Sequence, residues 1–175
     1  MDRGEFHFLT TEEIEIIKSW EGMVAFSDFD QMNLVDKDGL LAETLNQIKI
    51  KSPERTTNQN TLWLSESLLN VLLTTRNLIK RGEFAHAHQS FSSVQKYLLW
   101  LIRITTDKTQ HWESPTKSLE KDIDSTWYSA YITVTSDLQP ENIRLSFENS
   151  LKLTKRLFEQ LNVEPKLKEI LNRIR

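Results

Sequence analysis

The sequence contains no cysteine and only four glycines and four prolines among its 175 residues. Without cysteine the chain has neither disulfides nor thiolate metal ligands, as expected for a protein of the reducing cytoplasm. So few glycines and prolines favour long helices over a fold built from many turns. An excess of one charge is missing too: 22 basic and 25 acidic residues give a net charge of −3, which offers no general attraction to nucleic acid or to an anionic membrane.

Long apolar runs are also absent. The longest stretch, at residues 97–102, is far too short to cross a bilayer, and the first residues lack the apolar segment of a signal peptide. Hydrophobic residues make up 38% of the chain and charged residues 27%, which is the composition of a globular protein. We therefore expect a soluble chain that buries a core and does not bind membranes.

The spacing of apolar residues predicts a mainly α-helical fold. Residues 57–81 carry leucines at helical spacing and end at Gly82, and residues 83–106 carry a second apolar stripe, so the two segments predict a helical hairpin. Further helices are predicted at residues 115–123, which begin with Pro115, and at residues 125–136, 141–162 and 165–174. We interpret residues 51–175 as a helical bundle.

Residues 1–50 differ from the rest and predict a small α/β lead-in to the bundle. Residues 5–9 alternate between apolar and polar side chains, which is typical of a strand with Glu5 and His7 on its polar face. The other predicted elements are a helix from a Thr10–Glu13 capping box to about Trp20, a strand at residues 32–35 and a helix at residues 40–48.

Two short patterns could carry chemistry by themselves. In Ser27–Asp30 the carboxylates of Asp28 and Asp30 are one residue apart, as in sites that clamp two metal ions, but no Gly-Ser phosphate turn precedes them and we interpret them as a solvated loop. Arg81 and His86, with four residues between them, match the pair that HEPN ribonuclease toxins use at the scissile ribose. The alternative for Arg81 is a basic residue at a helix C-terminus closed by Gly82.

The aromatic residues allow two interpretations as well. Trp63, Trp100, Trp112 and Trp127 either pack within the bundle, which we favour, or line a pocket for a drug-sized molecule. His111 and Trp112 predict a loop anchored by the indole, with the histidine exposed. His86 and His88 lie on different faces of one predicted helix, so they do not form a metal pair.

Several stretches, in this order, resemble the B-type lincosamide nucleotidyltransferases, relatives of the aminoglycoside nucleotidyltransferases. They are Arg3–Leu9, Asp36–Leu40, Lys80–Ala85, Gln95–Lys96, Leu101–Arg103, Trp112, Ser118–Ile123 and Asn149–Leu151. The resemblance covers the C-terminal part of that family and implies a bundle like HEPN and nucleotidyltransferase substrate-binding domains. In the family an N-terminal domain holds the Gly-Ser turn and two metal-binding carboxylates, and a third carboxylate follows in the Arg-Gly-Glu-Phe-His run.

The resemblance assigns roles to the first residues of the chain. Glu5 would be the catalytic base or metal partner, and Arg3 and His7 would lie near the nucleotide or drug. It also implies Mg²⁺ and ATP as cofactors, an antibiotic or nucleotide as ligand, and a homodimer. Because this chain starts just before Glu5, we expect a substrate-binding half of an AMP-transferring resistance enzyme that is inactive alone or works with a separate nucleotidyltransferase chain. A HEPN ribonuclease and a non-catalytic module that binds a small molecule or protein remain the alternatives.

Overall fold

The computed structural model describes residues 10–23, 26, 35–50 and 52–174, and it divides the chain into two compact units. The first unit is Met1–Glu54 and the second is Arg55–Arg175. The predicted strand at residues 5–9, with Arg3, Glu5 and His7 in or beside it, lies outside the described residues, and so does the Ser27–Asp30 stretch.

The described part of the first unit consists of two short helices, η1 (Thr11–Trp20) and α2 (Leu40–Asn46). The predicted capping box opens η1, where the backbone N–H of Thr10 donates to the carboxylate of Glu13 at 3.0 Å. This helix has the tighter 3₁₀ geometry along its whole length.

No strand occurs among the described residues of this unit. Val35, the described end of the strand predicted at residues 32–35, lies in irregular chain. The next residue, Asp36, turns back to accept the N–H of Ala42 at 2.8 Å. This hydrogen bond to the first turn of α2 therefore holds Asp36 in position.

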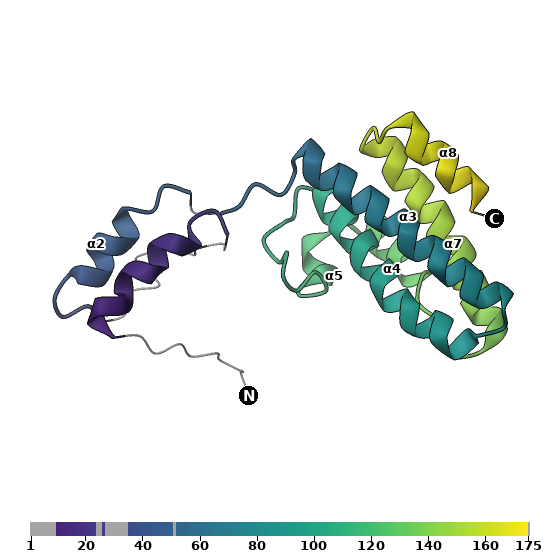
Figure 1. Cartoon of the computed structure of the whole chain (residues 1–175), viewed down its shortest axis with the longest axis horizontal. Helices are drawn as coiled ribbons and strands as arrows, with labels where there is room; N and C mark the ends of the chain where they lie inside the picture. The colour runs from purple at the N-terminus through teal and green to yellow at the C-terminus, as the bar shows by residue number, and fades with distance from the viewer. Residues whose placement is uncertain (1–9, 24–25, 27–34, 51, 175) are drawn as a thin grey trace. The chain divides into compact units, whose positions relative to one another are not determined.

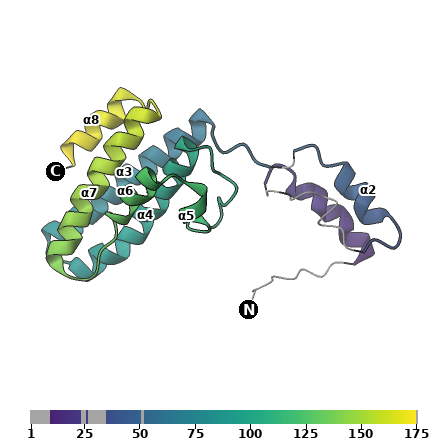
Figure 2. The ribbon, with the colours of Figure 1, turned by 180° about the vertical axis from the view of Figure 1, so that it is seen from behind.

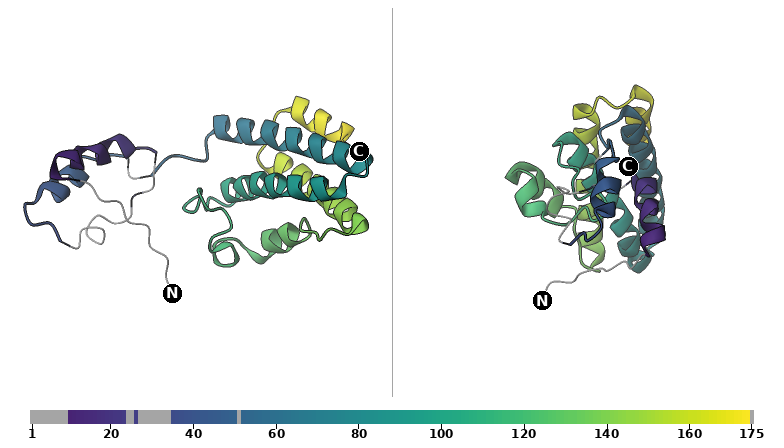
Figure 3. Two further views of the ribbon diagram at one scale, coloured as in Figure 1. Left: turned by 60° about the horizontal axis from the view of Figure 1, so that its bottom comes forward. Right: turned by 90° about the vertical axis from the view of Figure 1, so that its left-hand side faces the viewer.

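The second unit is the predicted helical bundle. Three long helices run along one another, α3 (Asn58–Lys80), α4 (Phe84–Thr105) and α7 (Pro140–Gln160), as Figures 1 and 2 show. Three shorter helices pack around them: α5 (Leu119–Asp122), α6 (Ser125–Ile132) and α8 (Pro165–Arg173). In Figure 3, left, α8 lies beside α3, while α6 lies on the other side of the bundle beside α4. Among the residues that the structure describes, no helix has the length and apolarity of a membrane span.

Local signals set the ends of these helices. The hydroxyl of Thr57 accepts the N–H of Asn60 at 3.1 Å and caps α3. Gly82, with φ of +75°, supplies the left-handed turn between α3 and α4 that other residues adopt only with strain. Pro140 and Pro165 stand in the first turns of α7 and α8, where a missing N–H costs nothing.

The core lies where the three long helices meet. Leucines of α3 interlock with apolar residues of α4 and α7, and each fully buried large side chain contributes roughly 1.5–3 kcal/mol of transfer free energy. The predicted stripe of α4 is confirmed at Phe91, Leu98 and Ile102, which are buried, while Phe84 is half-buried under the guanidinium of Arg144.

Two predicted helices are shorter than the sequence indicated. The helix predicted at residues 115–123 is reduced to α5, because the carbonyls of Pro115 and Lys117 accept hydrogen bonds from Arg103 at 2.8 Å and are not available to a helix. The placement of Pro115 in a first helical turn was therefore wrong. The helix predicted at residues 125–136 ends at Ile132, and a turn at Thr133 and Val134 follows it.

Candidate functional site

The proposed ribonuclease pair lies at the exposed turn between α3 and α4. Arg81 ends α3, His86 lies in the first turn of α4, and their side chains are 58% and 64% exposed. Glu83, between them, accepts from the Nε of Arg81 at 2.5 Å and lies 3.5 Å from the Nδ1 of His86. The hydrogen bond from Arg81 lowers the pKa of Glu83, so this carboxylate stays ionised and occupies both partners. The pair is thus exposed at this turn, with Glu83 bound to Arg81, and the ribonuclease alternative stays a prediction.

Three of the tryptophans form a packed chain on the surface of α3 and α4. Trp63 and Tyr97 contact Trp100, which stacks on Trp112 with ring centres 5.5 Å apart and donates its indole N–H to the Trp112 carbonyl at 2.8 Å. Trp127 is buried elsewhere, under the guanidinium of Arg156. The four tryptophans therefore pack in two places, in line with the favoured interpretation.

The loop that contains Trp112 is anchored by the indole, as predicted. His111 is more enclosed than the sequence suggested, with 24% of its side chain exposed, and its Nε2 lies 3.8 Å from the carboxylate of Asp122.

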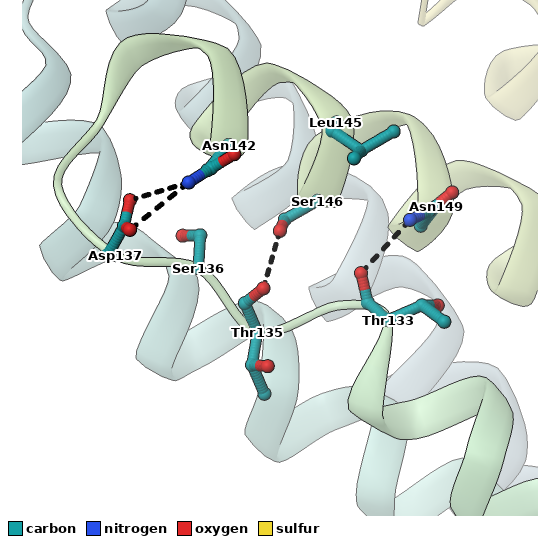
Figure 4. A pocket seen from close by; sticks show the side chains of 8 residues that line it. All are labelled: Thr133, Thr135, Ser136, Asp137, Asn142, Leu145, Ser146 and Asn149. Carbon is teal, nitrogen blue, oxygen red and sulfur yellow. Dashed lines mark hydrogen bonds between the residues drawn. The ribbon is translucent and has the colours of Figure 1, made fainter.

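A polar pocket lies between α7 and the connecting segment at residues 133–136, which begins with a turn at Thr133 and Val134 and continues as irregular chain. The carbonyls of this segment bind side chains on two different helices. On one side, the carbonyls of Thr133 and Thr135 accept from Asn149 at 3.1 Å and from Ser146 at 2.7 Å, both on α7 (Figure 4).

The other two carbonyls of the segment face α4. The Val134 carbonyl accepts from the side chain of Gln95 at 3.2 Å, and the Ser136 carbonyl accepts from the Nε2 of His88 at 3.0 Å. Because a carbonyl can only accept, the proton of His88 is on Nε2 in this contact. Four side chains, two on α4 and two on α7, thus bind the four carbonyls of this segment and fix its position.

The pocket has a volume of about 440 Å³, and seven of its eight lining residues are polar. They are Thr133, Thr135, Ser136, Asp137, Asn142, Ser146 and Asn149, and Leu145 is the eighth. Leu145 is 55% exposed, so the pocket combines hydroxyl and amide groups with one apolar contact that faces solvent. The hydroxyl of Ser136 is buried and has no hydrogen-bond partner among the described residues, which leaves one polar group for a ligand or water to satisfy.

Asp137 supplies the negative charge of the pocket. Its carboxylate accepts the N–H of Gln139 at 2.8 Å and the amide of Asn142 at 3.1 Å. These hydrogen bonds, with a smaller contribution from the charge of His88, hold the pKa of Asp137 below its ordinary value of 3.8. Asp137 therefore presents an ionised carboxylate at all physiological pH values.

The comparison with known families bears on the same bundle. Residues 57–174 match the model of the lincosamide nucleotidyltransferase-like C-terminal domain. The chain belongs to this family. No curated protein sequence matches it. The matched range begins one residue before α3 and includes every residue of the polar pocket, so the pocket is part of the lincosamide nucleotidyltransferase-like C-terminal domain.

Metal-binding residues do not gather in the described part of this family member. No group of three histidine, aspartate or glutamate side chains there is close enough to hold a metal ion. Glu5, the carboxylate that the resemblance assigns to metal, lies outside the described residues.

Sequence reasoning missed the polar pocket. The signals were present in the β-branched run Ile132–Thr135, which weakens a helix, and in the polar spacing of Asn142, Ser146 and Asn149 along one face of α7. Neither signal is specific, because β-branched residues occur within helices and polar residues are the rule on a solvated helix face.

Proposed function

We propose that the helical unit is the acceptor-binding half of an AMP-transferring antibiotic-resistance enzyme of the lincosamide or aminoglycoside nucleotidyltransferase type. In this proposal the polar pocket holds the antibiotic, and a nucleotidyltransferase domain, on the same polypeptide or on a separate one, supplies the metal-binding carboxylates. The observation that carries the proposal is the family match over residues 57–174, which includes the whole pocket.

The chemistry of the pocket fits such an acceptor. These antibiotics are hydroxyl-rich sugars that also carry a basic amine, and hydroxyl groups pair with the side chains of Thr133, Ser136 and Asn149 as donors and acceptors. The ionised carboxylate of Asp137 provides a counter-charge for the amine, and Leu145 offers an apolar contact. Few convergent polar groups beside an apolar one are typical of small-molecule sites.

Transfer of AMP also needs groups that stabilise the attacking hydroxyl and the leaving pyrophosphate, and metal ions held by carboxylates of the nucleotidyltransferase domain would supply that stabilisation. Among the residues that the structure describes, no group of three histidine, aspartate or glutamate side chains could hold such an ion. The contribution proposed for the helical unit is to bind the acceptor and orient its hydroxyl, which alone can lower a reaction barrier by several kcal/mol.

The test is a calorimetric or NMR titration of the purified 175-residue chain with clindamycin and with an aminoglycoside. We expect saturable binding of at least one of them, weakened about tenfold by Asp137→Asn, since a charge-assisted contact is lost while the shape is kept. Asp107→Asn is the matched control: Asp107 is exposed, lies outside the pocket and has a left-handed φ of 53° that asparagine tolerates.

Two outcomes would contradict the proposal. One is the absence of binding by either antibiotic class, and the other is binding that Asp137→Asn and Asp107→Asn weaken equally. In a separate assay the chain is incubated with Mg-ATP and clindamycin and analysed by mass spectrometry. We expect no adenylated product from this chain alone, and its appearance would show that the chain carries the complete catalytic machinery.

A further inference from the structure

A second, smaller cavity continues the polar pocket along α7. It has a volume of about 180 Å³ and is lined by Ala130, Thr133, Asn149, Lys152, Leu153 and Arg156. Thr133 and Asn149 line both cavities, so the two form one groove between α7 and the chain that runs from α6 to Asp137. The hydrogen bond from Asn149 to the Thr133 carbonyl marks the point where they join.

The two ends of the groove carry opposite charges. Asp137 and its partner Asn142 lie at one end, and Lys152 and Arg156 lie at the other. Asn142 and Arg156 are separated by 14 residues of α7, which at 1.5 Å per residue is about 21 Å along the helix axis. A ligand that fills the groove therefore contacts hydroxyl and amide groups in the middle and cations at the far end.

Lys152 and Arg156 are positioned to bind an anion. The guanidinium of Arg156 lies over the ring of buried Trp127, 4.0 Å from its centre, which fixes one face and leaves the N–H edges free to donate. Lys152 lies 3.5 Å from the side-chain oxygen of Asn149. Among the described residues no carboxylate is within 4 Å of Lys152 or Arg156, and Arg156 donates no hydrogen bond.

We propose that Lys152 and Arg156 bind the phosphate group of a ligand whose hydroxyl-bearing part occupies the polar pocket. Arginine pairs with phosphate through two parallel hydrogen bonds, and an adjacent lysine adds a compact positive charge. Leu153 and Ala130 supply an apolar contact beside the two cations in the smaller cavity. The inference rests on the proposed function in its choice of ligand: an acceptor hydroxyl that has received AMP carries such a phosphate, so the groove binds the product as well as the acceptor.

The experiment is a titration of the full 175-residue chain with AMP, adenosine and inorganic phosphate at low ionic strength, monitored by NMR or calorimetry. AMP and phosphate are expected to bind, and adenosine at least tenfold more weakly than AMP. Lys152→Gln and Arg156→Gln are each expected to weaken phosphate binding about tenfold, the loss of one charge-assisted contact at a partly solvated site. Lys155→Gln is the matched control, because it removes the same charge from the same helix at an exposed position outside both cavities.

Arg156 also packs on Trp127, so its replacement is paired with Arg156→Lys and with a circular dichroism spectrum that checks the fold. Arg156→Lys keeps the charge and is expected to retain more phosphate affinity than Arg156→Gln. Equal losses in Lys152→Gln and Lys155→Gln would overturn the proposal, since they would indicate a diffuse surface charge. Undetectable binding of both AMP and phosphate would overturn it too.

The failure of this inference is distinguishable from the failure of the proposed function. If the antibiotic binds in an Asp137-dependent way while AMP and phosphate do not bind, only the phosphate site is wrong. If phosphate binds in a Lys152-dependent way while neither antibiotic class binds, the phosphate site stands and the assignment of the acceptor is wrong.

Discussion

Arg103 is a fully buried charge in the second unit. Its side chain is fully buried, and its guanidinium donates to the carbonyls of Pro115, Lys108 and Lys117 and to the carboxylate of Asp122, at 2.8 to 3.0 Å. These acceptors lie in the irregular chain between α4 and α5 and in α5 itself. One side chain therefore satisfies backbone groups that no helix or strand satisfies.

Replacing Arg103 with methionine keeps most of the volume and removes all of these donors. The carboxylate of Asp122, which is 13% exposed, loses its ion pair, and three backbone carbonyls lose a partner. Removing one member of a buried ion pair costs about 3–5 kcal/mol, out of a total of about 5–15 kcal/mol for a typical domain. We expect Arg103→Met to lower the free energy of unfolding by about 4 kcal/mol, which corresponds to a fall in Tm of about 12 °C for a unit of this size.

The assay is urea and thermal unfolding followed by far-UV circular dichroism, on Arg103→Met, Asp122→Asn and the double variant. The double variant should lose less than the sum of the single losses, by at least about 1 kcal/mol, because the two groups share one contact. Arg103→Lys, which keeps the charge with fewer donors, is expected to lie between the wild type and Arg103→Met. A loss below about 1 kcal/mol in Arg103→Met, or strictly additive losses, would refute the role given to this residue.

Three further predictions concern single positions. Gly82→Ala should cost about 1 kcal/mol in urea unfolding, because Gly82 has φ of +75° and the strain is in the backbone, with no neighbour within 4 Å of an added Cβ; an unchanged stability would contradict this. Asp124→Ala should cost about 1 kcal/mol, since the carboxylate caps α6 by accepting from Thr126 and Trp127, and Asp124→Ser should restore much of the loss. The hydrogen bonds of Asp137 lower its pKa, so the carboxylate stays ionised as the pH falls from 7 to about its ordinary value of 3.8. Its contribution to stability and to cation binding is therefore lost only below that value. An antibiotic affinity that drops with a midpoint near pH 5 would exclude Asp137 as the counter-charge.

The long helices were predictable because their signals are local and repeated. The apolar stripes of α3, α4 and α7 recur over five or six turns, and the stops at Gly82 and before Pro165 are specific. Errors at the ends of these helices amount to one or two residues, since the same residues that cap a helix in isolation cap it in the fold.

The irregular segments were not predictable, because distant side chains decide them. Pro115 precedes a sequence that favours a helix, yet Arg103 takes the carbonyls that such a helix would need. Residues 133–136 were predicted to continue α6, yet their four carbonyls bind side chains of α4 and α7. The hydrogen bonds from Gln95 and His88 join residues that are 39 and 48 positions apart, and such contacts produce no periodic pattern in a single sequence. Neither the segment nor the pocket beside it could therefore be predicted from the sequence.

Several of the short stretches that resemble the family contain residues that hold the connections between helices. Gln95 and Asn149, each from one of those stretches, bind carbonyls of the connecting segment at residues 133–136 from α4 and from α7. Arg103, Trp112 and Asp122, from three others, organise the chain between α4 and α5. The core residues of a bundle can be exchanged for others of similar size at small cost. By contrast, Gln95, Asn149 and Arg103 each bind particular backbone carbonyls. Asp122 accepts from Arg103, and Trp112 stacks on Trp100. The resemblance thus follows the residues that fix the connections of the bundle, and the pocket proposed to bind the antibiotic is built on one of those connections.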